Sequence, residues 1–217
     1  MSSAYIEQAE KAVKLTEQLA EADLSTEWPN LDFESDGVKI YSRQPKEFPE
    51  AQEKMLFTIV HIDAPIEKVF KLVQIYGPYR QKWDDLLERQ EVVETLSDDT
   101  YIVHSFVKKK LILSARDAVE VCQIKRRPDG VIIHAVQGVD YPDRPPQKNY
   151  VRTKQFISGT YLKPLDGDRT EFRHVLSADL NLPIPRLMAS MVASFKPRLV
   201  SDTIGLLKKA AKTMKVE

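Results

Sequence analysis

The sequence predicts a single α+β domain in which a strongly curved antiparallel sheet wraps around one long C-terminal helix. Short turn sequences such as Asp98-Asp99 and Pro128-Asp129-Gly130 separate consecutive strand-like segments, and strands joined by short turns pair antiparallel. One helix does not cover so many flat strands, so we expect the sheet to curve and to leave an internal tunnel. No linker divides residues 1–217, which indicates one domain.

Helices and strands alternate in the first part of the chain. Residues 3–23 are rich in Glu, Lys and Ala with apolar residues near one side, so an outer N-terminal helix is expected within residues 1–25. A break at residues 28–30 follows. Alternating and apolar runs then predict strands, and the Ala64-Pro65 start and a later aromatic-rich run predict two short helices. The expected strands are 37–44 and 53–62, and the expected helices are 65–75 and 79–85.

Strands dominate the second part. The expected segments are 87–95, 100–108, 116–127, 131–139, 149–164 and 169–179. A long apolar stripe at helical spacing then predicts the C-terminal helix, residues 185–214, with Pro197 inside it. Its softened start, rich in Met and Phe, either gates a cavity or docks permanently on the sheet. The candidate gate residues of this helix are Met188, Met191, Val192 and Phe195.

Composition excludes several classes of protein. Lys+Arg and Asp+Glu both number 32, so there is no overall attraction to nucleic acid. The single cysteine, Cys122, forms no internal disulfide, which fits a reducing compartment. We find no signal peptide, no membrane span and no lipidation motif. The sequence therefore predicts a cytoplasmic monomer that touches membranes only transiently and at their surface.

Catalytic and metal-binding motifs are not recognisable. None of the four histidines has a metal-ligand spacing with another His or with Cys, and no nucleophile elbow, phosphate loop or dinucleotide fingerprint occurs. We therefore expect no metal, no cofactor and no enzymatic activity. An enzyme would need two or more of His104, His134, His174 and Asp84 to converge in a pocket with a nucleophile or a bound water, and this alternative stays open.

Three local features are candidates for a binding site. Arg80 and Asp84 lie four residues apart in the expected short helix, where they form either a solvated pair or a pair that faces a cavity. Arg116 and Asp117 are adjacent in a strand, so one of the two charges is expected to face inward. The alternative is that they serve in a cross-strand ion pair or cap a turn.

The third feature is a stretch of three lysines followed by three aliphatic residues between two strands. It is either a strand end with a buried turn or a lid that touches membranes, in which the lysines meet anionic headgroups and the aliphatic side chains dip in. The candidate membrane contacts are Lys108, Lys109 and Lys110, and the candidate lid residues are Leu111, Ile112 and Leu113.

Several stretches, in this order and spacing, resemble the START (steroidogenic-acute-regulatory-related lipid transfer) domain family over nearly the whole chain. They are residues 79–84, 99–104, 114–117, 151–156 and 177–185. The resemblance implies a helix-grip fold, a curved antiparallel sheet around a long C-terminal helix with a lipid tunnel between them. It also implies a lipid-binding or lipid-transfer protein that holds one lipid at a time and exchanges it at membranes.

The resemblance also suggests which lipid is bound. The Arg-x-x-x-Asp spacing of Arg80 and Asp84 is similar to the headgroup pair of phosphatidylcholine and ceramide carriers, and Arg116 would be a cavity arginine. The positions that match the aromatic cage of phosphatidylcholine carriers are His104, Ala118 and Phe156, of which only Phe156 has a cage-like ring. We therefore expect a phospholipid with its headgroup class open. A sterol carrier and a lipid sensor are the alternatives.

Overall fold

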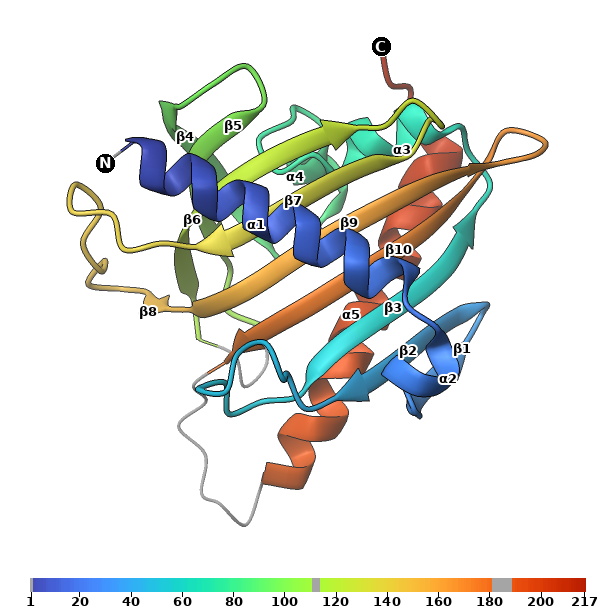
Figure 1. Ribbon diagram of the computed structural model, residues 1–217, viewed down its shortest axis with the longest axis horizontal. Coiled ribbons are helices and arrows are strands. Elements are labelled where there is room, and N and C mark those ends of the chain that lie inside the picture. The colour runs from blue at the N-terminus through green and yellow to red at the C-terminus, as the bar shows by residue number, and fades with distance from the viewer. Residues whose placement is uncertain (1, 111–113, 181–188) are drawn as a thin grey trace.

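A computed structural model describes residues 2–110, 114–180 and 189–217. Its described strands form one 10-stranded sheet in the order β1-β2-β3-β10-β9-β7-β6-β5-β4, with β8 pairing in parallel with β6 and every other pair antiparallel (Figure 1). The strands are β1 (Asn30–Ser35), β2 (Val38–Arg43), β3 (Met55–Ile62), β4 (Leu87–Thr95), β5 (Thr100–Val107), β6 (Arg116–Arg126), β7 (Ile132–Gly138), β8 (Val151–Arg152), β9 (Lys154–Leu165) and β10 (Arg169–Asp179).

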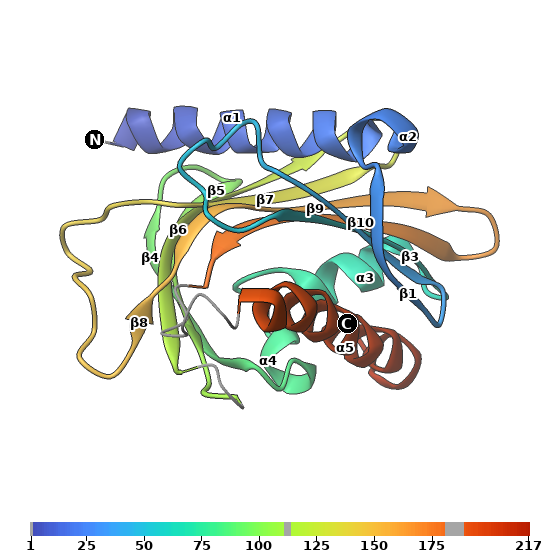
Figure 2. The same cartoon turned by 90° about the horizontal axis from the view of Figure 1, so that it is seen from below.

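Helices cover both faces of this sheet. Helix α1 (Ser2–Glu21) crosses the outer face over β6, β7, β9 and β10. Helix α5 (Ala189–Thr213) lies against the concave inner face, together with α3 (Ile66–Val73) and α4 (Arg80–Trp83), as Figure 2 shows. A curved antiparallel sheet around a C-terminal helix is the helix-grip fold, so the predicted fold class is confirmed.

Small residues let α1 approach the sheet closely. A Cβ atom placed on Gly159 of β9 would lie 2.1 Å from Thr16 Oγ1 of α1, so no larger residue fits there without a shift. Ala9, Ala12 and Ala20 of α1 are buried against the sheet as well. The helix therefore rests on the backbone of the central strands, and its neighbours Val13 and Leu19 pack into the outer core.

The inner core joins α5 to α3 and to the sheet. Ile204 and Leu207 of α5 share one apolar cluster with Val69 and Phe70 of α3 and with Leu162 of β9. Burial of these side chains is the main stabilisation of the layer. Among the residues whose side chains the structure describes, α5 also contributes Ala210 and Ala211 to this cluster, and Val200 packs against it.

Most described elements differ from the expected ranges by one or two residues at an end, and three features differ by more. Helix α1 ends at Glu21, and a separate turn, α2 (Leu24–Glu27), follows, with the Asp23 carboxylate accepting a hydrogen bond from Thr26 N at 3.1 Å. Strand β1, which begins at Asn30 in the expected break, was not predicted from the sequence. Its residues are almost entirely exposed and show no alternation of apolar and polar side chains. The expected strand 149–164 is divided at Thr153, whose N–H donates to Asp117 O at 2.8 Å.

Candidate functional site

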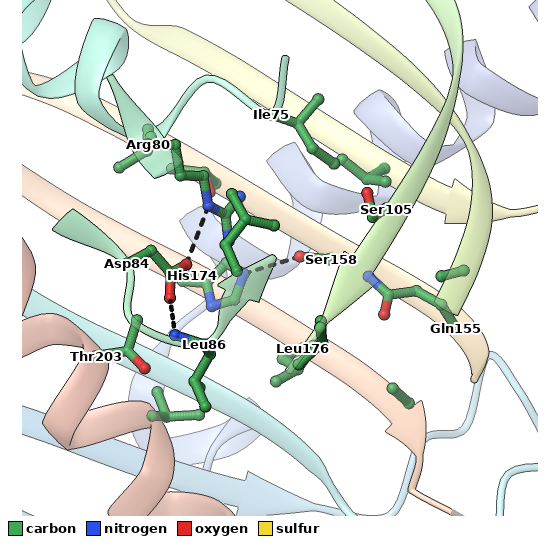
Figure 3. Close-up of a pocket in the computed structure, with 18 of the residues that line it drawn as sticks. Ile75, Arg80, Asp84, Leu86, Ser105, Gln155, Ser158, His174, Leu176 and Thr203 are labelled. Carbon is green, nitrogen blue, oxygen red and sulfur yellow. Dashed lines mark hydrogen bonds and ion pairs between the residues drawn. The ribbon is translucent and has the colours of Figure 1, made fainter. Parts of the chain in front are cut away.

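A cavity of about 300 Å³ lies between the inner face of the sheet and α5. Its wall comes from α3, α4, α5 and the strands β4, β5, β6, β7, β9 and β10. Much of the wall is apolar, and the apolar side chains include Val73, Ile75, Leu86, Leu87, Val107, Val136, Phe172, Leu176, Leu199, Val200, Ile204 and Leu207. Figure 3 shows that polar side chains such as Ser105, Gln155 and Ser158 border the same space.

Arg80 and Asp84 form an ion pair in this wall. Arg80 Nε donates to Asp84 Oδ2 at 3.3 Å, and Asp84 Oδ1 accepts a hydrogen bond from Leu86 N at 3.1 Å (Figure 3). Asp84 is buried, whereas the Arg80 side chain is 31% exposed. The indole of Trp83 fixes the short helix by donating to Leu72 O at 2.9 Å. Of the two interpretations of the pair, the structure therefore supports the one in which it faces a cavity.

Arg116 is the second arginine of the wall, at the start of β6. Its side chain is buried, and none of its three guanidinium nitrogens finds a hydrogen-bond partner among the described residues. Burial lowers the pKa of this guanidinium, and the charge of Glu53 opposes the effect. A buried cation without a partner is costly, so this position suits an anionic group of a ligand.

The neighbouring carboxylate, Asp117, turns to different partners. It accepts hydrogen bonds from Arg152 Nη2 at 2.7 Å and Nε at 3.1 Å, and it lies 2.8 Å from His104 Nε2. This carboxylate therefore has its own cation, so the two adjacent charges of β6 do not neutralise each other.

Two predicted headgroup residues do not line the cavity. The ring of His104 lies against that of Phe106, tilted by 34° with centroids 4.1 Å apart, and its Nε2 faces Asp117. Alternation along β5 turns Ser105, not His104, to the cavity. Phe156 is the extra residue of a β-bulge opposite Ser177 and Ala178, which turns its ring onto Phe48 at a centroid distance of 5.4 Å. The assignment of His104 and Phe156 to the headgroup site is corrected accordingly.

A buried carboxyl in the cavity was missed by the sequence analysis. Glu120 of β6 lines the wall, and its Oε2 accepts a hydrogen bond from Ser105 Oγ at 2.9 Å. Gln90 Nε2 in turn donates to Ser105 Oγ at 3.2 Å. Burial raises the pKa of Glu120 to about 7. Counting every second residue inward from Arg116 along β6 would have reached this side chain.

Two histidines of the wall stay neutral. Burial, and secondarily the charge of Arg80, lowers the pKa of His134 to about 3 and that of His174 to about 4. His134 Nε2 lies 3.0 Å from Cys122 Sγ, but burial raises the thiol pKa well above its usual value, so no reactive thiolate forms. His174 Nε2 lies 3.0 Å from Ser158 Oγ (Figure 3). Within the described ranges, no group of His, Cys, Asp and Glu suits a metal ion.

The start of α5 carries a buried lysine. Lys196 lines the cavity, donates from Nζ to Ala178 O at 2.6 Å and contacts Glu53 Oε2 at 3.1 Å. Phe195 is half-buried and is not a wall residue. The other predicted gate residues cannot be placed against the cavity. Four of them lie outside the described residues: Leu111, Ile112, Leu113 and Met188. Met191 and Val192 belong to α5, but their side chains are not described.

The predicted membrane-contact lysines precede the lid segment. Lys108 and Lys109 are exposed, and Lys110 Nζ forms a salt bridge with Asp85 Oδ2 at 3.0 Å. Two cations next to the undescribed segment are thus accessible, and the third is paired. No helix in the described part of the chain has the length and hydropathy needed to cross a membrane.

Comparisons with known proteins agree with this architecture. Bovine (Bos taurus) StAR-related lipid transfer protein 5 is 28% identical over 184 residues, which cover 82% of this chain and 84% of the relative. Human StAR-related lipid transfer protein 6 is 27% identical over 128 residues, covering 54% and 57%. The structure of human StAR-related lipid transfer protein 5 superimposes with a TM-score of 0.87 at 24% identity, covering 98% of both chains.

A more distant structure shows the same fold. The crystal structure of human STARD10 superimposes with a TM-score of 0.77 at 17% identity and covers 92% of this chain and 78% of that one. The sequence model of the START domain matches residues 8–213 of this chain. The chain therefore belongs to the START domain family of lipid-binding and lipid-transfer proteins.

Proposed function

We propose that this protein carries one phospholipid in the cavity and exchanges it at membranes without catalysing a reaction. The observation that supports this most is the composition of the cavity wall, which combines a large apolar surface with the guanidinium groups of Arg80 and Arg116. Acyl chains suit the apolar part, and phosphate oxygens suit the guanidinium groups. Bound lipid is the only ligand that the proposal requires, with no metal or cofactor.

The headgroup is assigned to Arg80. A guanidinium has five N–H donors, and the described residues accept only from Nε of Arg80, through Asp84. The terminal nitrogens are thus able to donate to a phosphate, while Asp84 holds the arginine in place. Arg116 offers a second cation to another anionic or ester oxygen of the same lipid.

Exchange requires that the cavity opens at a membrane. Transfer of one sixteen-carbon chain from the protein into water costs about 12 kcal/mol, at about 0.8 kcal/mol per methylene. Spontaneous release into water is therefore very slow. The lid segment 111–113 and the segment around Met188 are the sequence-predicted gate, and the exposed Lys108 and Lys109 beside the lid suit an anionic membrane surface. The proposed carrier is a cytoplasmic monomer in contact with membranes only during exchange.

A sterol is the second candidate, favoured by the size of the cavity. The volume of about 300 Å³ lies at the lower end of the range for small-molecule pockets. A compact ring system fits such a volume more easily than two full acyl chains, which require a wider opening. The polar groups of the wall favour the phospholipid, and the volume favours the sterol.

Native mass spectrometry of protein purified from cells without added lipid separates the two candidates. An adduct of phospholipid mass is expected, at one lipid per chain. A sterol adduct would reject the phospholipid and keep the fold. Protein that is bare and takes up neither lipid from vesicles would reject the carrier function altogether.

Variants of the site test the two parts of the proposal. Arg80→Ala should lower phospholipid loading without loss of fold, whereas Arg169→Ala, an exposed arginine outside the cavity wall, should not change it. Normal loading of Arg80→Ala would remove the headgroup assignment. Replacement of Leu111, Ile112 and Leu113 by serine should slow transfer between vesicles but not binding in detergent, and unchanged transfer would refute the lid.

A further inference from the structure

Glu120 is a carboxyl group that the proposed headgroup site does not use. It lies on the same face of β6 as Arg116, four residues further along the strand, and both side chains line the cavity. Four residues of strand span roughly 13 Å, so the two groups occupy different parts of the cavity. The group next to Glu120 in the wall is Ser105 of the neighbouring strand β5.

The hydrogen bonds of Glu120 leave part of its accepting capacity unused. Oε2 accepts from Ser105 Oγ at 2.9 Å, and Ser105 is itself oriented by the donor Gln90 Nε2 at 3.2 Å. No described residue donates to Oε1 or forms a salt bridge with this carboxyl. A carboxylate with two oxygens has about four acceptor sites. The cavity therefore contains a fixed acceptor that a ligand donor can reach.

The charge of Arg80 acts on this same carboxyl. Burial raises the pKa of Glu120, and the charge of Arg80 lowers it in part. The guanidinium donates through Nε to Asp84 and keeps its terminal nitrogens for a ligand. The cationic Arg80 and the carboxyl of Glu120 thus face the same cavity and interact electrostatically. This pair suits a zwitterionic ligand whose anionic group meets Arg80 and whose cationic group meets Glu120.

We infer that Glu120, together with Ser105, binds a primary ammonium group of the ligand, so that the headgroup is phosphoethanolamine. The inference rests on the proposed phospholipid carrier, in which Arg80 takes the phosphate. The ammonium group has three N–H donors. One donates to the free oxygen of Glu120, and another donates to the hydroxyl oxygen of Ser105. The positive charge of the ammonium also compensates the buried carboxylate.

Choline is a poorer match for this part of the cavity. A trimethylammonium group has no N–H to donate, and proteins bind it with several aromatic rings. Among the described wall residues, only Trp83 and Phe172 carry an indole or phenyl ring. The positions expected to form a cage, His104 and Phe156, are turned to Asp117 and Phe48 instead.

Vesicles that contain equal amounts of phosphatidylethanolamine, its N-methyl and N,N-dimethyl forms and phosphatidylcholine test the inference. The loaded protein is re-isolated, and its lipid is identified after extraction. We expect loading to fall with each added methyl group, with phosphatidylethanolamine over phosphatidylcholine by about tenfold or more, which corresponds to one charge-assisted hydrogen bond. Glu120→Gln should bring that ratio close to one by lowering the loading of phosphatidylethanolamine more than that of phosphatidylcholine, and Gln137→Glu, outside the cavity wall, should leave the ratio unchanged.

The outcomes separate this inference from the function on which it rests. Equal loading of all four lipids by the unaltered protein, or an unchanged ratio in a folded Glu120→Gln, would overturn the role of Glu120 and leave the phospholipid carrier intact. If Glu120→Gln does not fold, Ser105→Ala takes its place, and an unchanged ratio in that variant has the same meaning. Uptake of cholesterol but of none of the four lipids would reject the phospholipid carrier itself.

Discussion

Replacement of Glu120 by glutamine should make the protein more stable at alkaline pH. The carboxyl is buried, and its pKa is raised from 4.5 to about 7 in the folded protein. Below pH 4.5 the carboxyl is protonated in both states, so it does not affect stability. As the pH rises from 4.5 to 7, the unfolded chain ionises first and the folded state loses stability relative to it.

The size of the effect follows from that shift. A shift of about 2.5 pKa units corresponds to about 3 kcal/mol, at 1.36 kcal/mol for each unit. Glutamine keeps the shape and can accept the hydrogen bond of Ser105 but does not ionise. The difference in unfolding free energy between Glu120→Gln and the unaltered protein should therefore grow by about 3 kcal/mol between pH 4.5 and about pH 8.

Urea unfolding of both proteins across this pH range measures the difference. His134 and His174 have lowered pKa values and destabilise the folded state as the pH falls below 6.5, but they are present in both proteins and cancel. The measurement is made on delipidated protein, since a bound ammonium would lower the pKa of Glu120. A stability difference that does not vary with pH would refute the burial of this carboxyl and weaken its proposed role.

Three further variants test other parts of the structure. Gly159→Ala should destabilise the fold by about 1–3 kcal/mol in urea unfolding, because its Cβ would lie 2.1 Å from Thr16 Oγ1. Adding Thr16→Ala should restore part of this loss, and an undiminished stability of Gly159→Ala would contradict the close packing of α1. Arg116→Met should raise the stability of delipidated protein by about 1 kcal/mol or more and lower phospholipid loading, and a less stable variant would show that the guanidinium is paired. Asp117→Asn should cost about 1–3 kcal/mol in urea unfolding, because the buried carboxylate loses its charge-assisted hydrogen bonds from the partly exposed Arg152. The headgroup ratio should change little, and a changed ratio would show that Asp117 acts on the ligand.

The features that were predictable from the sequence are those set by local spacing. Arg80 and Asp84 pair because residues four apart meet at one turn of α4, whatever surrounds them. The bounds of β4 and β10 match the expected strands at both ends, and the turn residues Gly167 and Asp168 set the start of β10. The overall fold followed from the order of these elements and from the need to cover a large sheet with one long helix.

The features that were missed depend on pairing between distant segments. The β-bulge that turns Phe156 away arises where β9 meets β10, and the sequence of β9 alone gives no signal for it. Strand β1 exists because β2 offers it an edge, although its own residues are mostly exposed. Glu120 was overlooked because a charged residue inside an apolar strand was not assigned to a face.

The same side chains that suit a polar headgroup also affect the stability of the lipid-free protein. Arg116 without a described partner and Glu120 with a raised pKa both indicate that charges in the cavity lack compensation when no lipid is present. A lipid that supplies an anion and an ammonium removes that deficit, and one that supplies only an apolar body does not. Selectivity and stabilisation by lipid should therefore rank ligands in the same order, because both depend on the same buried charges.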